Sequence, residues 1–238
     1  MIKDLFKAVR IPLLFVAIIT IIHAYSSYYG IRLSHYGIYP RELKGIIGIF
    51  TSPFIHGDWK HLFNNSVPLV VLGSALFHFY KRLAPRVLIY SIIYTGILVW
   101  LGGRPSFHIG ASGLVYALAS FLFISGFVRK HRPLMAISMA VVFIYGGMIW
   151  GIFPREEHIS WEGHLYGAFN GLFWALYYRE EGPQRKKYSW EIEEEVLNSL
   201  DGIEVIYEEL DTYEPKPEPI SYNYEYIHKT PNKKIVKE

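Results

Sequence analysis

Residues 110–128 read GASGLVYALASFLFISGFV, an apolar segment that begins with Gly-Ala-Ser-Gly. Residues 163–178 read GHLYGAFNGLFWALYY, a second apolar segment that begins with Gly-His. A polar side chain inside a membrane-length segment is costly to keep there, so Ser112 and His164 are both candidates for function. Together they suggest a nucleophile and its general base, held by two helices within a lipid bilayer.

Apolar stretches of this kind recur along most of the first 180 residues. The composition is 51% hydrophobic and 17% aromatic over 238 residues, and a spanning helix needs about 20 residues. Six stretches meet or approach that length: Ile11–Tyr29, Leu62–Phe79, Val87–Leu101, Gly113–Val128, Leu134–Phe153 and Leu165–Tyr178. The third, fourth and sixth are short and need flanking residues or a locally thinned bilayer. The sequence therefore predicts an all-α membrane protein, a bundle of six transmembrane helices over residues 1–180.

The composition also excludes some chemistry. The chain has no cysteine, which excludes a disulfide, a thiolate nucleophile and a cysteine-bound metal. Lys3, Lys7 and Arg10 precede the first apolar stretch and resemble the start of a signal peptide. That stretch is long and no small-residue cleavage site follows it, so it is expected to be a retained first helix.

Charge divides the chain into two parts. Residues 1–178 carry 15 Lys/Arg against 6 Asp/Glu, and residues 179–238 carry 9 against 15. The basic residues fall in loops, which positive-inside topology explains better than nucleic-acid binding. The loops on one side hold 13 Lys/Arg and the opposite loops hold 6. We therefore expect a multi-pass protein of the cell (inner) membrane with both termini in the cytoplasm, and with Ser112 and His164 near the opposite face.

Two regions outside the apolar stretches also carry a pattern. The segment Gly30–Lys60 is too long for a simple connection, which favours a structured loop. Residues 181–238 are expected to form an acidic, partly disordered cytoplasmic tail with one amphipathic helix, Trp190–Leu200. Ile203–Leu210 fits a strand or a helix, and the Pro-rich, acidic end beyond Asp211 is typical of irregular structure. The sequence leaves open whether the tail binds a cytoplasmic partner.

Ser112 stands where a serine often serves only as a helix cap. The residues around it do not form the Gly-x-Ser-x-Gly elbow of an α/β-hydrolase, because Leu114 occupies the last glycine position and no strand precedes it. Ser112 nevertheless opens an apolar helix. The start of a helix offers free N–H groups and a positive dipole end, which suit a developing oxyanion.

His164 is the natural general base for this serine. On a helix it shares a face with Gly167 and Gly171, and such glycines let a neighbouring helix approach closely. Gly113 is small enough to receive that face, so close packing would bring His164 within hydrogen-bonding reach of Ser112. Ordinary helix packing explains the glycines equally well, and a polar contact between helices explains the histidine.

No third member of a triad is evident. The six acids of residues 1–178 all lie in loops or at segment ends, and none is placed to orient His164 from behind. A dyad is therefore favoured over a triad. Tyr116, one turn after Ser112, is placed to pack its ring against the imidazole, although core filling would explain it equally well.

A third polar group occupies residues 56–65, which read HGDWKHLFNN. His61 and Asn65 are four residues apart at a helix start, so they point the same way. An amide and an imidazole N–H are suitable donors to an oxyanion. A metal site is the rival interpretation. The spacing of His56 and His61 does not match the zinc-binding His-Glu-x-x-His pattern, and no acid completes a ligand set, so neither a metal nor a cofactor is expected.

In this order and spacing, the three groups resemble the rhomboid family of intramembrane serine proteases. The matching residues are His56, His61 and Asn65, then Gly110, Ser112, Gly113 and Tyr116, then His164, Gly167 and Gly171. Residues 37–41 (GIYPR) and 45–56 (GIIGIFTSPFIH) are also similar to bacterial members. The resemblance covers about residues 10–180. The Trp-Arg pair that some members carry in the first loop is absent from this sequence.

The resemblance implies a six-helix rhomboid-like bundle in which Ser112 is the nucleophile and His164 the general base. His61, Asn65 and the backbone N–H of Ser112 would form the oxyanion hole. Substrates would be single-span membrane proteins, cleaved in or next to their transmembrane segments. The alternative is a catalytically inactive rhomboid-like protein that binds membrane clients. A small transporter is disfavoured because charged residues and broken helices near the midplane are missing.

Overall fold

The computed structural model describes residues 2–154, 160–185 and 187–200 of the chain. It divides into two units, Met1–Lys187 and Tyr188–Glu238. The first unit contains all six apolar stretches and every candidate site residue named above, so the account of the site concerns this unit alone.

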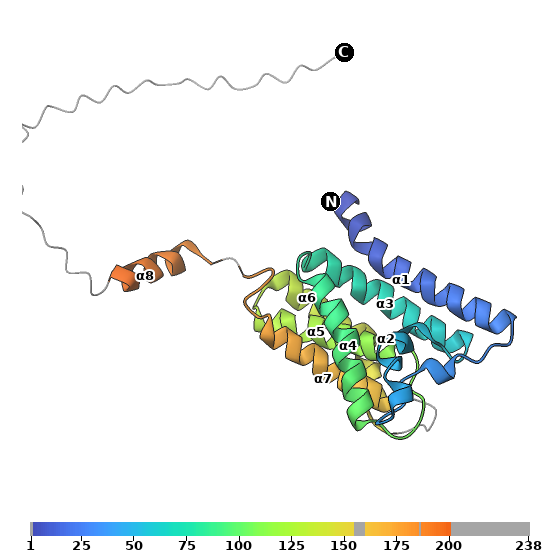
Figure 1. Ribbon diagram of the computed structural model, residues 1–238. Helices are drawn as coiled ribbons and strands as arrows, with labels where there is room; N and C mark the ends of the chain where they lie inside the picture. The colour runs from blue at the N-terminus through green and yellow to red at the C-terminus, as the bar shows by residue number, and fades with distance from the viewer. Residues whose placement is uncertain (1, 155–159, 186, 201–238) are drawn as a thin grey trace, which may run out of the picture. The chain divides into compact units, whose positions relative to one another are not determined.

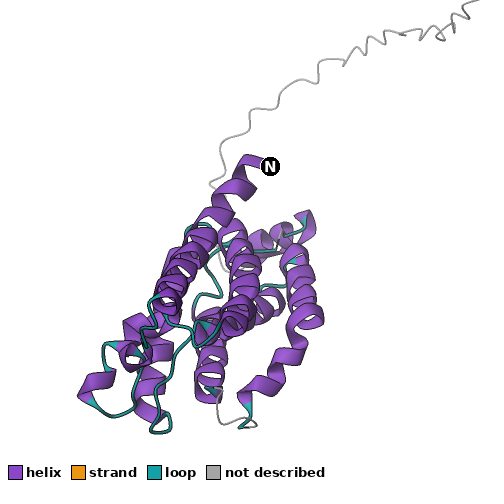
Figure 2. Cartoon of the chain, turned by 90° about the vertical axis from the view of Figure 1, so that its right-hand side faces the viewer, coloured by secondary structure: helices purple, strands orange, loops and turns teal. Residues whose placement is uncertain are grey.

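The first unit is a bundle of helices. Its long helices are α1 (Ile2–Tyr28), α3 (Trp59–Phe79), α4 (Ala84–Gly102), α5 (Ser112–Val128), α6 (Arg132–Tyr145) and α7 (Trp161–Tyr177). Figures 1 and 2 show these helices lying alongside one another. Helix α5 is central, because it packs against α3, α4, α6 and α7, while α1 packs against α3 at one side.

Three helices of the bundle have the length and composition to cross a membrane: Phe6–Tyr28, Trp59–Phe79 and Ala84–Gly102. Helices α5 and α6 are apolar but shorter, and α7 has 17 residues. Large apolar side chains along α1 face outward, for example Leu14 and Ile21, which are 61% and 67% exposed. A hydrocarbon environment satisfies such a surface, and water does not. The chain is therefore a helical, multi-pass membrane protein, and the number of six spans stays a prediction.

The core of the bundle forms around α5. Its fully buried side chains come mainly from α5 and α3: Leu69, Leu72, Leu76, Leu114, Val115, Leu118, Phe121 and Leu122. The Tyr80 ring, at the end of α3, meets the Phe121 ring edge-on with the centroids 5.1 Å apart. A central helix that is apolar on all sides is expected to be buried by its neighbours, so the sequence of α5 explains its position.

The segment between α1 and α3 is structured, as its length predicted. It contains three short 3-10 helices, Ser34–Tyr36, Leu43–Gly45 and Ser52–Phe54, together with α2 (Gly48–Thr51). An isolated antiparallel bridge joins Ile38 of this segment to His108 of the α4–α5 connection. The segment is thus held against the part of the chain that leads into α5.

The fifth apolar stretch differs from the prediction of one continuous segment over Leu134–Phe153. Helix α6 ends at Tyr145, and the chain continues as a 3-10 helix over Gly146–Ile152. Two adjacent glycines begin this change. Glycine has the lowest helix propensity after proline, and tighter 3-10 turns are common where an α-helix ends.

The contact between α5 and α7 is made by backbone on both sides. A Cβ placed at Gly167 would overlap the carbonyl oxygen of Gly113, and one at Gly171 would overlap that of Ala117. No side chain separates the two helices at these points. The close approach that the small residues predicted is therefore present, and it spans two turns of each helix.

Arg129 is buried, which the sequence did not indicate. It is one of the loop charges from which the topology is predicted, and it is only 3% exposed. Its Nη2 donates to the carbonyl oxygens of Tyr178 and Glu181, and its guanidinium lies over the Tyr80 ring at 5.2 Å. The last carbonyls of a helix have no intrahelical donor. Arg129 supplies one, and it links the end of α5 to the end of α7.

The second unit contains α8 (Ser189–Leu200), which confirms the predicted amphipathic helix. Its apolar side chains are exposed, including Trp190 (60%) and Leu197 (68%). The predictions for Ile203–Leu210 and for the irregular end beyond Asp211 lie outside the described residues.

The replacement Gly171→Val should push α5 and α7 apart, because the atoms it meets are backbone atoms that cannot turn aside. We expect the free energy of unfolding to fall by about 1–3 kcal/mol, as for an overpacked core. Thermal unfolding of the purified protein in detergent measures this change. Gly57→Ala is the matched control, because a Cβ there meets only Ile109 Cδ1 at 3.9 Å. Equal transition temperatures for the two variants would contradict the role given to Gly171.

Candidate active site

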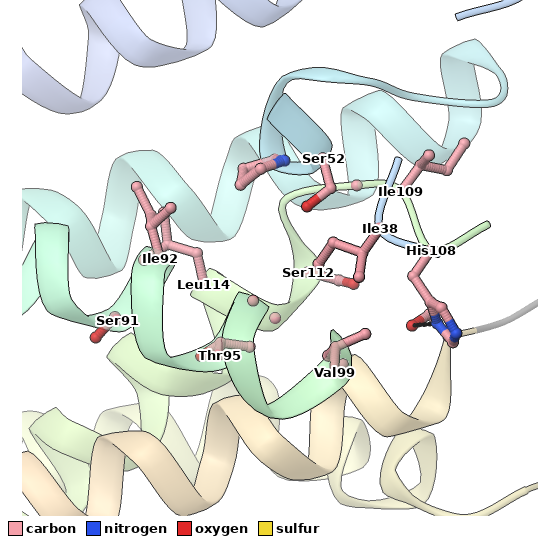
Figure 3. Close-up of a pocket in the computed structure, with 16 residues that line it drawn as sticks. Ile38, Ser52, Ser91, Ile92, Thr95, Val99, His108, Ile109, Ser112 and Leu114 are labelled. Carbon is pink, nitrogen blue, oxygen red and sulfur yellow. Dashed lines mark hydrogen bonds between the residues drawn. The ribbon is translucent and has the colours of Figure 1, made fainter. Parts of the chain in front are cut away.

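Ser112 is the first residue of α5, and its hydroxyl is not used as a helix cap. The N-cap residue is Ala111, and no side chain caps this helix end. Ser112 lines a cavity of about 40 Å³ together with Ser52, Thr95 and Gly163 (Figure 3). The first N–H groups of a helix have no intrahelical acceptor, so Ser112 combines a free hydroxyl with unused backbone donors.

His164 lies in the first turns of α7 and is held on two sides. Its ring stacks on the Tyr116 ring with centroids 4.3 Å apart and planes 9° apart. Its Nδ1 lies 2.9 Å from the carbonyl oxygen of Gly151. A carbonyl oxygen can only accept, so Nδ1 carries the proton and Nε2 of the neutral ring is left as an acceptor. An imidazole in this tautomer can take a proton from a serine hydroxyl.

The backbone contact between α5 and α7 brings the serine and the histidine into one region. A Cβ at Gly113 would lie 3.1 Å from the carbonyl oxygen of Gly163, so the residues next to Ser112 and His164 touch. No hydrogen bond joins Ser112 to His164 among the described residues. Such bonds are often long in an enzyme without substrate and shorten when substrate binds.

His61 and Asn65 lie beside Gly110, two residues before Ser112. A Cβ at Gly110 would lie 2.6 Å from Nε2 of His61 and 3.5 Å from Nδ2 of Asn65. Gly110 also has a φ of +104°, a conformation that side chains rarely adopt. Position 110 therefore requires glycine for two reasons, the lack of space for a side chain and the positive φ. The absence of a side chain leaves the donors of α3 next to the start of α5.

His56 fixes the orientation of Asn65. The Nε2 atom of His56 lies 3.1 Å from Nδ2 of Asn65, and both residues are buried. An amide nitrogen only donates, so Nε2 of His56 accepts. One hydrogen of the Asn65 amide is used in this bond, and the second remains for another acceptor. The His61 ring packs edge-on against His56 with centroids 5.1 Å apart, which completes a connected group.

Comparison with known proteins identifies the family of the chain. Residues 44–181 match the family model described as the rhomboid domain, which covers more than half of the chain. The chain belongs to the rhomboid family. An uncharacterized protein of Mycobacterium tuberculosis (strain H37Rv) is 36% identical over 186 residues, which cover 73% of this chain and 75% of that protein.

Two further mycobacterial proteins are similar to this rhomboid. An uncharacterized protein of Mycobacterium bovis is 36% identical over 186 residues, again 73% of this chain and 75% of the relative. An uncharacterized protein of Mycobacterium leprae is 35% identical over 166 residues, which cover 65% of this chain and 64% of the relative. These likenesses extend over most of the membrane part of the rhomboid chain.

Sequence reasoning missed several contacts that surround the site of this rhomboid. His108 had no predicted partner, yet its Nδ1 lies 2.7 Å from Ser160 Oγ and its Nε2 lies 3.1 Å from the carbonyl oxygen of Arg104. Burial lowers the pKa of His108, so the ring is neutral near pH 7. Because the carbonyl must accept from Nε2, Nδ1 accepts from the Ser160 hydroxyl. The sequence signal for these contacts was only that His108 is a polar residue without a predicted partner.

One acid near the site, Glu162, is buried. Glu162 is 2% exposed and lies 3.5 Å from Nε of Arg104. The sequence placed Glu162 only at a segment end, and nothing in it indicated this pairing.

Within the described residues, no group of three or more histidines and acids is placed to hold a metal ion.

Asp58 caps the helix that carries His61 and Asn65. Its Oδ1 accepts from the backbone N–H of His61 at 2.8 Å. This bond is the main reason that the pKa of Asp58 lies below its ordinary value of 3.8. A capping carboxylate at the start of a helix also interacts favourably with the helix dipole. The cap therefore fixes the first turn of α3 at the site.

The Asp58 cap should make the rhomboid less stable in acid. A carboxylate whose folded pKa is depressed contributes stability above its unfolded pKa, and this contribution is lost as the pH falls through the folded pKa. We expect the loss below about pH 4. Asp58→Ala should cost about 1 kcal/mol at neutral pH, whereas Asp58→Asn keeps an acceptor oxygen and should lose less. Thermal unfolding between about pH 7 and pH 3 measures both effects, and a wild type and Asp58→Ala that differ by the same amount at every pH would contradict the titration.

Proposed function

We propose that this rhomboid is an intramembrane serine endopeptidase in which Ser112 and His164 form a catalytic dyad. The observation that carries the proposal is the tautomer of His164. The Gly151 carbonyl holds the proton on Nδ1, so Nε2 is an acceptor. Gly163, next to His164, lies against Gly113, next to Ser112. A carboxylate performs the corresponding task in a Ser-His-Asp triad. Here a backbone carbonyl replaces it.

The reaction follows from the groups present. His164 would accept the Ser112 proton while the serine oxygen attacks a peptide carbonyl. The carbonyl carbon becomes tetrahedral, and the amine then leaves with the proton from His164. Water hydrolyses the acyl-enzyme by the same two transfers in reverse. Tyr116 supports the orientation of the ring through the stacked contact at 4.3 Å.

The oxyanion would be held by donors that already point into the region. The second hydrogen of the Asn65 amide is not used by His56, and His61 reaches the backbone at Gly110. The Ser112 N–H at the start of α5 adds a third donor. Positioned donors of this kind stabilise the transition state because they need no reorganisation when the charge develops.

The membrane part of the proposal rests on the apolar helices and on the charges of the loops. Six spans would place both termini in the cytoplasm of the cell (inner) membrane and the dyad toward the opposite face. Substrates would be single-span membrane proteins, cleaved in or next to the spanning helix. The tail over residues 181–238 would lie in the cytoplasm, where a partner could reach it.

A client-binding protein without hydrolysis is the second candidate. The observation in its favour is that no hydrogen bond joins Ser112 and His164 among the described residues. Such a protein has no need for the fixed tautomer of His164 or for the paired amide of Asn65. The protease is therefore the better supported of the two.

Ser112→Ala and His164→Ala should each abolish cleavage of a single-span substrate reconstituted with the protein in liposomes, because each removes one member of the dyad. Ser120→Ala, on the same helix, and His35→Ala, exposed in the 3-10 helix Ser34–Tyr36, are matched controls that should cleave like the wild type. Product bands on a gel measure the rate. Equal cleavage by the wild type and both dyad variants would refute the protease, and retained client binding without cleavage by any variant would favour the second candidate.

Asn65→Ala should lower kcat by about 10²–10³-fold, as the loss of one oxyanion donor does. The adjacent Asn64 is exposed on the same helix turn, so Asn64→Ala should leave the rate unchanged. The kcat values come from initial rates at saturating substrate in liposomes. A similar small effect of both substitutions would exclude Asn65 from the oxyanion hole.

A further inference from the structure

Two polar contacts tie the segment that leads into Ser112 to the beginning of α7. In one, the backbone N–H of Arg104 donates to Glu162 Oε1 at 3.2 Å, and Arg104 Nε lies 3.5 Å from the same oxygen. In the other, Ser160 Oγ donates to Nδ1 of His108 at 2.7 Å. Figure 3 shows His108 reaching the start of α7 in this way. We call these four residues the loop clasp.

The loop clasp joins the two pieces of chain that carry the dyad. Arg104 and His108 belong to residues 103–111, which lead into Ser112, while Ser160 and Glu162 precede His164 by four and two positions. The backbone of His108 is also bonded to Ile38 on its other side, at 2.8 and 3.0 Å. The segment before Ser112 is thus held from two directions, by Ile38 on one side and by the loop clasp on the other.

Ser160 uses its hydroxyl in an unusual way for its position. It is the N-cap residue of α7, where a serine normally accepts from a backbone N–H of the first turn. No side-chain cap is present at this helix end. The hydroxyl instead donates across to His108. Ser160 therefore forms no capping hydrogen bond within α7, and its hydroxyl connects the two segments instead.

Glu162 is also a costly residue if its role is stability alone. It is 2% exposed, and its Oε2 has no hydrogen-bond partner among the described residues. Burying a charged pair often stabilises a fold less than apolar side chains of similar size would. A buried carboxylate whose second oxygen is unsatisfied therefore needs another reason to be present, and its contact with the segment before Ser112 supplies one.

We propose that Glu162 and Ser160 are positioning residues for the dyad, acting through Arg104 and His108 to fix the separation of Ser112 Oγ and His164 Nε2. This inference rests on the proposed protease function. Reacting groups must be held closely, since a misplacement of about 1 Å by a remote change can cost about 10²-fold in rate. Glu162 and Arg104 do not line the cavity beside Ser112. Loss of the Glu162 contact should therefore lower kcat and leave KM nearly unchanged.

The experiment compares kcat and KM for a single-span substrate in liposomes. Glu162→Ala should lower kcat by about 10- to 100-fold with KM within about threefold of the wild type. Glu162→Gln keeps an oxygen acceptor for the Arg104 N–H and should recover most of the lost kcat. Glu42→Gln is the matched control, because it removes an exposed carboxylate that pairs with Lys44 at 2.8 Å, and it should behave like the wild type.

A second variant covers the case in which Glu162→Ala does not fold, judged by its circular dichroism and its elution as a single species. Ser160→Ala removes only one hydroxyl and should lower kcat by about threefold to tenfold. Wild-type kcat in Glu162→Ala, or in Ser160→Ala where the first variant does not fold, would overturn the positioning role alone. A wild type that neither cleaves substrate nor reacts at Ser112 with a fluorophosphonate would overturn the protease function, and the inference would fall with it.

Discussion

The backbone contact between α5 and α7 is the constraint on which the rest of the site depends. Gly167 faces the carbonyl of Gly113, and Gly171 faces that of Ala117. Helices that meet without intervening side chains are held at a short separation by many small dispersion contacts. Because Ser112 begins one helix and His164 lies near the beginning of the other, this separation sets the distance between the proposed nucleophile and base before any polar interaction acts.

The polar groups of the site then act on a frame that is already fixed. Tyr116 and the Gly151 carbonyl decide the plane and tautomer of His164, and His56 decides which way the Asn65 amide points. Each functional group is thus oriented by a partner that takes no part in the reaction itself. This is the arrangement that electrostatic preorganisation requires, since the donors and acceptors are aligned before the charge develops.

Part of this site could be predicted from the sequence because some of its features are periodic. The spacing of His164, Gly167 and Gly171 predicts a shared helix face, and that of His61 and Asn65 does the same for α3. The Gly151 carbonyl could not be predicted, because every residue has a carbonyl and no side chain marks the one that is used. The pair of Arg104 and Glu162 is separated by 58 residues, and no local pattern connects them. The burial of Arg129 could not be predicted for a related reason, since a charged residue near a helix end usually faces water.

The 3-10 helix over Gly146–Ile152 has a consequence for the proposed dyad. Bonds in a 3-10 helix are less well aligned than those of an α-helix, and such stretches often mark hinges. The acceptor that holds the His164 proton belongs to this stretch. If the stretch opens, Nδ1 loses its partner and the proton is free to move to Nε2, which removes the acceptor that Ser112 needs. The His164 tautomer that the proposed dyad needs is therefore favoured only while this 3-10 stretch stays closed.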